Sequence, residues 1–337
     1  MTIQDVIAKL IEGEDLTREE TVGAMDRIMS GDATDAQIGA FLVALRLKGE
    51  TVEEIAGAAE VMCEKATRID TRHKVVVDTS GTGGDHSGTF NISTAAAFVV
   101  SGAGLCVAKH GNRAISSLCG SADVLNALGV NIEASPHTVG RCLDEVGIGF
   151  LFAPALHGAM KYAIGPRREL GIRTIFNVLG PLTNPARARR QVVGVYSGAL
   201  TGPLSEVLGR LGAERAFVVH GSDGLDEITL TGATRVSELR DGSVSTYEIT
   251  PEDFGFSRAD AEDLKGGDAK TNARIVRSVL SGDPGPGRDI VLLNAAAGIV
   301  AGGLAGDMSA GIEAARQAVD SGRAMEKLEG LKTVSHE

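Results

Sequence analysis

The sequence predicts a small helical domain over residues 1–66 and a larger α/β domain over residues 74–337 with a mostly parallel central sheet. The first 66 residues read as four helices, several of which begin with a clear capping signal. From Lys74 onward, short runs of apolar residues alternate with helical segments. Such runs are typical of strands buried on both faces, as in a parallel sheet that is covered by helices.

Three of the four N-terminal helices are expected to begin with a capping box, in which a Thr and a Glu or Gln three residues later satisfy free backbone amides. The pairs are Thr17 with Glu20, Thr34 with Gln37, and Thr51 with Glu54. The segment over residues 38–47 consists almost entirely of apolar and small residues. A helix this apolar must pack against other helices, either of its own domain or of another subunit.

Strands and helices alternate in the rest of the chain. We expect strands at residues 75–77, 105–108, 148–152, 192–195, 216–219 and 244–247. We expect helices at residues 93–101 with Ser93 as the N-cap, in a segment that ends at Leu128, and at residues 136–146, 200–211, 269–280, 289–300 and 309–321. Ligands of such sheets bind beyond the carboxyl ends of the strands, so the loops after the strands are expected to carry the function.

Composition excludes several classes of protein. The net charge of −11, the absence of Trp and an aromatic content of 4% argue against a nucleic-acid-binding protein. The four cysteines show no CxxC spacing, which favours buried thiols in a reducing compartment. The N-terminus reads as an acidic amphipathic helix rather than a signal peptide, and no apolar run approaches the roughly 20 residues of a membrane span. We therefore expect a cytoplasmic protein that binds neither nucleic acid nor membrane.

Two segments after the first expected strand are suited to bind an anion. Residues 78–85 (DTSGTGGD) place three glycines within four residues, which lets backbone amides approach a phosphate. The spacing matches neither a P-loop nor a dinucleotide fingerprint, and alone it is more often only a structural turn. Residues 89–94 (TFNIST) add hydroxyl and amide groups at a helix start, where phosphate also binds, although a plain N-cap is the alternative.

A second polar loop follows the next expected strand. Residues 109–117 (KHGNRAISS) bring together two cations, an amide and two hydroxyls, and Gly120 and Ser121 begin the next helix. Clustered donors after a buried strand suit a diphosphate and a 5′-phosphate. His110 alone is more often a structural histidine than a catalytic one.

These motifs resemble those of the anthranilate phosphoribosyltransferase family, and the resemblance runs in order through essentially the whole chain. The segments that carry it are GTGGD at 81–85, NIST at 91–94, KHGNRAISS at 109–117, RRELG at 167–171, RT at 173–174, NVLGPLTNP at 177–185, HG at 220–221 and GLDE at 224–227. The resemblance implies a fold similar to that of the pyrimidine nucleoside phosphorylases. It also implies a homodimer made through the helical domain, which part of residues 160–185 would join, and an active site at the hinge between the domains.

The implied reaction transfers the phosphoribosyl group of 5-phosphoribosyl-1-pyrophosphate (PRPP) to the amine of anthranilate, in tryptophan biosynthesis. The PRPP-binding residues that the resemblance implies are Gly81, Gly84, Asp85, Thr89, Asn91, Ile92, Ser93, Thr94, Lys109, His110, Gly111, Asn112, Arg113, Ala114, Ile115, Ser116, Ser117 and Ser121. Adjacent loop carboxylates are usually only solvated, but beside a PRPP site Asp226 and Glu227 indicate magnesium. By the resemblance, Asp226 and Glu227 hold one Mg²⁺, and Glu227 shares a second with the Ser93 hydroxyl, which gives two ions per subunit.

The acceptor contacts are expected from Arg167 and Asn112. A guanidinium can bind the anthranilate carboxylate through two parallel hydrogen bonds, which suits Arg167, although a surface ion pair with Glu169 is the alternative. The resemblance implies that Asn112 orients the amine. An aromatic amine is neutral at pH 7, so we assign no general base. The chain has Gly158 where the family usually has Pro, which leaves the shape of this acceptor loop open. Binding of a glutamine amidotransferase partner also stays open.

Two other functions are alternatives on the sequence alone. A pyrimidine nucleoside phosphorylase would share the layout but would need only inorganic phosphate, so Asp226, Glu227 and the Arg167 stretch oppose it. A non-catalytic or nucleic-acid-binding protein on the same scaffold should be basic and should have lost its magnesium and acceptor residues. This chain is acidic and its motifs are intact.

Overall fold

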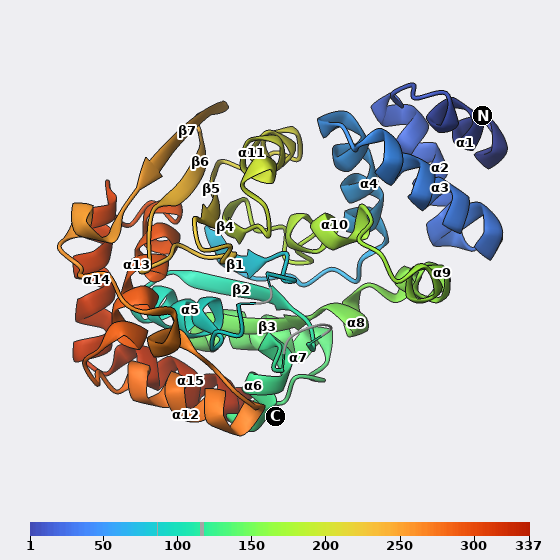
Figure 1. The fold of residues 1–337 in the computed structure, drawn as a ribbon. Helices are drawn as coiled ribbons and strands as arrows, with labels where there is room; N and C mark the ends of the chain where they lie inside the picture. The colour runs from blue at the N-terminus through green and yellow to red at the C-terminus, as the bar shows by residue number, and fades with distance from the viewer. Residues whose placement is uncertain (86, 115–117) are drawn as a thin grey trace.

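The computed structural model describes residues 1–85, 87–114 and 118–337. The expected PRPP contacts Ile115, Ser116 and Ser117 therefore lie outside the described residues. Figure 1 shows a bundle of N-terminal helices at one end of a larger body, in which helices cover a twisted sheet. This is the predicted architecture. Within the described ranges, no helix is both long and apolar enough to cross a membrane.

The bundle consists of α1 (Ile3–Ile11), α2 (Arg18–Ser30), α3 (Asp35–Lys48) and α4 (Val52–Lys65). The three predicted capping boxes are confirmed, and a fourth, not predicted, begins α1. Glu54 of α4 also joins other parts of the bundle, because its buried carboxylate accepts the Leu16 N–H at 2.9 Å and lies 3.0 Å from the Lys48 ammonium. The cap of one helix is thus also a tertiary contact.

Seven strands form one sheet in the order β3-β2-β1-β4-β5-β6-β7. They are β1 (Val76–Gly81), β2 (Cys106–Gly111), β3 (Ile148–Phe152), β4 (Arg190–Gly194), β5 (Arg215–Gly221), β6 (Thr234–Arg240) and β7 (Ser243–Ile249). The strands from β3 to β5 in this order are parallel, and β6 and β7 add an antiparallel edge. The prediction of a mostly parallel sheet is confirmed, but β6 was not predicted because its polar and apolar residues mix.

The first two strands extend further than the sequence predicts. Placing residues 109–111 in a loop is wrong, because they continue β2 and pair with residues 150–152 of β3. In the same way Ser80 and Gly81 continue β1 and pair with Val193 and Gly194 of β4. Pairing with a neighbouring strand decides where each strand ends, and these neighbours are distant in sequence.

The remaining helices agree with the predicted ones in place, with some additions. They are α5 (Ile92–Gly102), α6 (Ser121–Ala127), α7 (Pro136–Arg141), α8 (Ala153–Leu156), α9 (Ile164–Leu170), α10 (Phe176–Leu182), α11 (Thr201–Arg210), α12 (Ala269–Leu280), α13 (Pro286–Ala301), α14 (Met308–Asp320) and α15 (Arg323–Val334). The helix predicted at 136–146 divides into α7 and a π-helical turn, η1 (Cys142–Val146). Helices α8, α9, α10 and α15 were not predicted, and the first three contain the helix-unfavourable residue Pro.

The two faces of the sheet lie in different apolar cores. Val192 and Phe217 face a core that contains α5 and α12–α15, which Figure 1 shows on one side of the sheet. Their neighbours Val193 and Val218 face the other side and belong to a core that also contains the buried residues of α1–α4, α10 and α11. The bundle and the sheet therefore share one continuous apolar core, which fixes the bundle beside the carboxyl ends of the strands.

The connection between β3 and β4 completes this junction. It contains η2 (Gly158–Tyr162), α9 and α10, which contact α2, α3 and α4 of the bundle. Gly158 has no positive φ, and a Cβ at this position would meet nothing within 4 Å, so the backbone here does not require glycine. This segment thus carries Arg167 and Asn177 between the two domains.

Candidate active site

The carboxyl ends of β1 and β2 and the loop after β5 enclose a cavity of about 300 Å³. Every expected site residue that the structure describes lines it, with the exception of Arg167. Lining residues that the sequence reasoning did not single out as ligands are Ser80, Thr82, Gly83, Ser87, Gly88, Phe90, Cys119, Gly120 and Asn177. Segments from four distant parts of the chain therefore meet in one place.

The glycine-rich segment (residues 78–85) forms part of the cavity wall, near the acid pair Asp226 and Glu227. Gly83 and Gly84 have φ of +63° and +76°, values that favour glycine, and the Gly83 N–H donates to Asp226 Oδ2 at 2.8 Å. A Cβ on Gly81 would lie 2.6 Å from Asp226 Oδ2, and one on Gly194 would lie 1.5 Å from the Asp226 carbonyl oxygen. The glycines thus leave room for Asp226 to approach closely, and one of them also donates its backbone amide to Asp226.

The N-cap of helix α5 lies two residues earlier than predicted. Ser93 as N-cap is wrong, because Ile92 is already helical and Asn91 occupies the cap position without a side-chain cap bond. The Ser93 N–H donates to Glu227 Oε1 at 3.0 Å, so a carboxylate from a distant loop fulfils the capping role. The Ser93 hydroxyl stays in the cavity and accepts from Lys109 Nζ at 3.3 Å.

Lys109 is a buried cation at the end of β2, with only 3% of its surface exposed. Its ammonium also donates to the Thr79 carbonyl. Burial lowers the pKa of Lys109, and the nearby charges of Asp78, Glu227 and Asp226 oppose this lowering. The side chain therefore lies between a buried carboxylate on the β1 side and the acid pair on the cavity side.

His110 lines the cavity and is held by contacts to β1 and α10. Its backbone N–H donates to Asp78 Oδ1 at 3.1 Å, and its ring Nδ1 donates to the Gly180 carbonyl at 3.1 Å. The His110 ring lies 5.1 Å from the ring of His157, a neighbour that the sequence reasoning missed. Burial lowers the pKa of His110 to about 3 and that of His157 to about 4, so both rings are neutral at pH 7.

The acid pair is only partly exposed, unlike ordinary loop carboxylates. Burial raises the pKa of Asp226, and the charge of Asp85 raises it further. Burial and the charge of Asp226 likewise raise the pKa of Glu227. A divalent cation would relieve this repulsion, and two carboxylates with the Ser93 hydroxyl form the oxygen donor set that Mg²⁺ prefers.

These groups do not make a complete metal cage. The described part of the chain contains no cluster of three or more His, Cys, Asp or Glu side chains that could hold a metal. Mg²⁺ is usually bound by one or two carboxylates together with substrate phosphates and waters. The residues present therefore fit a cation that binds together with a phosphorylated ligand.

Asp123 organises the second loop, a role that the sequence reasoning missed. Its Oδ2 accepts the backbone N–H groups of Ala114 at 3.0 Å and Gly120 at 2.9 Å, and its Oδ1 lies 3.2 Å from the Arg113 guanidinium. The Ser121 hydroxyl donates to the Asn112 carbonyl at 3.2 Å. Contacts from α6 thus hold the loop at Asn112–Ala114 and at Gly120. The spacing of residues in the sequence does not indicate these contacts.

Arg167 lies beside the cavity. It belongs to α9, and its guanidinium carbon is 5.0 Å from the centre of the Phe176 ring. Burial lowers its pKa, and no ion pair with Glu169 is formed in the described residues. Asn177, which follows Phe176, lines the cavity. Arg167 thus stands next to the site on the side of the bundle.

Comparison with known proteins agrees with this architecture. A family model described as "Glycosyl transferase family, a/b domain" matches residues 73–325, and one described as "Glycosyl transferase family, helical bundle domain" matches residues 4–66. An anthranilate phosphoribosyltransferase of Geobacter sulfurreducens is 57% identical over 99% of this chain and 100% of its own length. The chain belongs to the anthranilate phosphoribosyltransferase family.

Solved structures of the family have the same fold. The crystal structure of anthranilate phosphoribosyltransferase from Thermus thermophilus is 44% identical, with a TM-score of 0.94 over 99% of this chain and 100% of that one. The enzyme from Saccharomyces cerevisiae, in complex with PRPP and Mg, is 31% identical, with a TM-score of 0.89 over 99% of this chain and 98% of that one. The arrangement of bundle and sheet is thus that of the anthranilate phosphoribosyltransferase family.

The space at Gly81 gives a direct test of the site. Gly81→Ala is expected to lower turnover at least about tenfold, because the new Cβ displaces the Asp226 carboxylate. Gly202→Ala in α11 is the control, since a Cβ there meets nothing within 4 Å. Steady-state rates and melting temperatures of both variants check this. Unchanged turnover in Gly81→Ala would show that the position of Asp226 does not matter.

Proposed function

We propose that this chain transfers the phosphoribosyl group of PRPP to the amine of anthranilate, which gives N-(5-phosphoribosyl)anthranilate and pyrophosphate in tryptophan biosynthesis. One observation carries the proposal: backbone amides, a buried ammonium and an acid pair converge on a single cavity. A donor with a diphosphate and a 5′-phosphate needs amides and a cation to bind its oxygens. It also needs carboxylates to bind the metal that accompanies it.

The donor would lie across the two loops. Residues of the glycine-rich segment and of the start of α5 line the cavity, and backbone amides there that do not bind Asp226, Glu227 or Gly194 would donate to phosphate oxygens. Lys109 adds a positive charge at the buried end of the cavity, and the half-exposed Arg113 adds one near its opening. These groups favour negative charge that grows on the departing pyrophosphate, so they lower the barrier as well as bind the donor.

The proposed magnesium sites follow from the oxygen ligands that the cavity offers. We propose two Mg²⁺ ions per subunit, one held by Asp226 and Glu227 and a second held by Glu227 and the Ser93 hydroxyl. When bound, the ions would stabilise the charge of the leaving pyrophosphate. The chain's part is to hold the carboxylates in place, through the Gly83 N–H on Asp226 and the Ser93 N–H on Glu227.

The acceptor would enter from the side of α9 and the bundle. Arg167 would bind the anthranilate carboxylate, and Asn112, which lines the cavity, would orient the amine. The neutral amine attacks C1 of the ribose, the C1–O bond breaks, and pyrophosphate leaves with the electron pair. The extra proton of the product amine can pass to solvent, so the chemistry requires no strong base.

The pyrimidine nucleoside phosphorylase alternative fits less well. Such an enzyme would bind one inorganic phosphate, which needs no acid pair in the same cavity. Asp226 and Glu227 would raise the negative charge around that phosphate without a role. The acid pair therefore favours a donor that binds with a divalent cation.

We propose that the chain forms a homodimer through its bundle. Large apolar side chains are exposed there and on the adjoining segment: Ile11, Leu47, Ile164 and Ile172 are 51–82% exposed. Helices α3 and α9 contact each other, so Leu47 and Ile164 come from neighbouring elements. Such exposed apolar groups are typical of a protein interface. We also propose a cytoplasmic location, because Cys63, Cys106 and Cys142 are free thiols, as is typical of a reducing compartment.

The proposal is tested by the fluorescence of anthranilate. In a mixture of protein, PRPP, Mg²⁺ and anthranilate, the fluorescence of anthranilate should fall as anthranilate is consumed. The amount of pyrophosphate released should equal the amount of anthranilate consumed. Each mixture that lacks one component should stay unchanged. A protein that releases no pyrophosphate from this mixture, but splits a pyrimidine nucleoside with inorganic phosphate, would make the alternative correct.

Turnover should require a divalent cation and should depend more on Glu227 than on Asp226. Excess EDTA is expected to abolish activity, because the acid pair and the diphosphate would then repel each other. Glu227→Gln should lower turnover more than Asp226→Asn, since Glu227 is assigned to both ions. Rates over a range of Mg²⁺ concentrations measure this. Equal, mild losses in both variants would contradict the assignment of Glu227 to two ions.

Arg167→Ala should weaken the binding of anthranilate and leave that of PRPP nearly intact. A hydrogen bond to a charged group contributes about 1.5–3 kcal/mol, so the KM for anthranilate should rise about tenfold or more. Arg167→Lys should restore only part of this, because an ammonium lacks the bidentate geometry. Arg168→Ala, at an exposed neighbour, is the control. Loss of PRPP affinity alone would place Arg167 in the donor site.

The dimer is tested by sedimentation at micromolar concentration. The wild-type chain should sediment as a dimer, and Leu47→Glu should shift it toward monomer because a charge is buried in the interface. Leu304→Glu is the matched control, since Leu304 is 51% exposed and lies far along the chain after α13. A monomeric wild-type protein would refute the proposed dimer.

A further inference from the structure

Arg173 contacts the glycine-rich segment from behind. It lies between α9 and α10, and its Nη2 donates to the carbonyl oxygen of Gly84. Its guanidinium carbon also lies 4.1 Å from the centre of the Tyr196 ring, so the planar group is held on an aromatic face. A Cβ on Gly84 would lie 3.2 Å from Nη2, which shows how closely the two residues pack.

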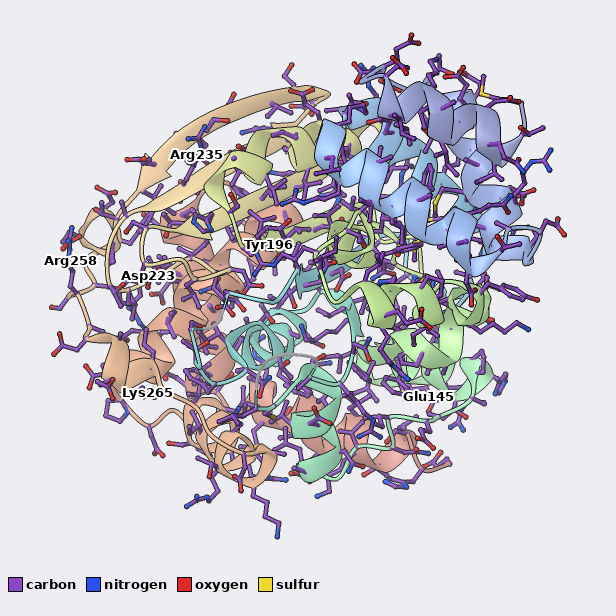
Figure 2. The ribbon with its side chains drawn as sticks, turned by 45° about the vertical axis from the view of Figure 1, so that its right-hand side comes forward. Glu145, Tyr196, Asp223, Arg235, Arg258 and Lys265 are labelled. Atoms are coloured by element: carbon purple, nitrogen blue, oxygen red, sulfur yellow. The ribbon has the colours of Figure 1, made fainter. Side chains whose placement is uncertain are left out.

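Tyr196, which Figure 2 labels, follows β4 and anchors the same segment a second time. Its backbone N–H donates to the Thr82 hydroxyl at 3.1 Å, and the Thr82 N–H donates to the Gly194 carbonyl at 2.9 Å. One residue thus holds Thr82 through its backbone and Arg173 through its ring. The glycine-rich segment is therefore fixed at two points, Thr82 and Gly84.

Arg173 lies outside the donor cavity. Gly84 and Asp85 line the donor cavity, which Arg173 does not line. Arg173 and Tyr196 instead line a separate cavity of about 250 Å³ between the bundle and α10, with Arg46, Glu50 and Ile55. The guanidinium therefore reaches Gly84 from the domain hinge.

The geometry of one peptide group links this contact to the donor. The chain has no cis peptide bonds among its described residues, so the Gly84 carbonyl and the Asp85 N–H point in opposite directions. With Arg173 bound to the carbonyl, the Asp85 N–H therefore points away from the guanidinium, and Asp85 itself lines the donor cavity. The positive charge on the carbonyl side also polarises the peptide and makes its N–H a better donor.

We propose that Arg173 is a positioning residue for PRPP, which fixes the Gly84–Asp85 peptide so that its N–H faces the diphosphate. The inference rests on the proposed function, since it assumes that the cavity binds PRPP. Arg173 touches neither substrate. Without it, Gly84 is free to rotate, because glycine with positive φ has few other constraints. PRPP would then have to order the segment when it binds, which lowers its affinity.

The test measures both substrates in Arg173→Ala. The KM for PRPP should rise about tenfold while the KM for anthranilate stays within about twofold, which corresponds to loss of one charge-assisted hydrogen bond. Arg173→Lys should restore part of the PRPP affinity, and added guanidinium ion at low concentration should partly rescue Arg173→Ala but not the wild type. Tyr196→Leu should give a smaller change in the same direction, and Tyr196→Phe should behave as wild type.

Controls separate the possible failures. Arg274→Ala, at an exposed position of α12, should leave both KM values and the melting temperature unchanged. A wild-type chain that neither binds PRPP nor consumes anthranilate would overturn the proposed function. An active wild type with an unaltered PRPP KM in Arg173→Ala would overturn the role of Arg173 alone. Equal losses for both substrates, with a lower melting temperature and no rescue, would make Arg173 a merely structural residue.

Discussion

The site depends on the charge interactions of one buried cation, the ammonium of Lys109, with the carboxylates around it. This ammonium lies between Asp78, which is buried beneath the cavity, and the acid pair Asp226–Glu227. Burial raises the pKa of Asp78 to about 6, and the Lys109 charge opposes that rise. A single cation thus supports carboxylates on two sides, which is too little positive charge for three acids and a polyphosphate together. This shortage of positive charge supports the proposal that a phosphorylated ligand binds here together with divalent cations.

The fold makes this crowding possible. Five parallel strands end at one edge, so the residues after β1, β2 and β5 meet there, although more than a hundred residues separate the loop after β5 from the other two. Glycines 81 and 194 leave the room that Asp226 occupies. The apolar core that joins the bundle to the sheet fixes α9 and α10 beside the same edge. The segments that carry the residues proposed for the donor and for the acceptor are therefore held together by one core.

The sequence predicts most of the elements and the two polar loops that line the cavity, because these depend on local signals. Capping boxes, apolar runs and glycine clusters each act within a few residues, and the predicted boxes at Thr17, Thr34 and Thr51 are present. What it does not predict depends on contacts between distant segments. The extension of β2 to Gly111 needs β3 as a partner, and Ser93 is displaced from the cap because Glu227 takes that role. The positions of Asp123, His157 and Arg173 are likewise visible only in three dimensions.

Calorimetric titration of the protein with PRPP, in Mg²⁺ and separately in EDTA, measures whether donor binding needs a divalent cation. We expect clear binding in Mg²⁺ and binding at least about tenfold weaker in EDTA, since uncompensated carboxylates then face the diphosphate. In Mg²⁺, the number of bound PRPP molecules should equal the number of subunits. Equal affinity for PRPP in Mg²⁺ and in EDTA would contradict the claim that the acid pair and the donor share the cavity only through a divalent cation.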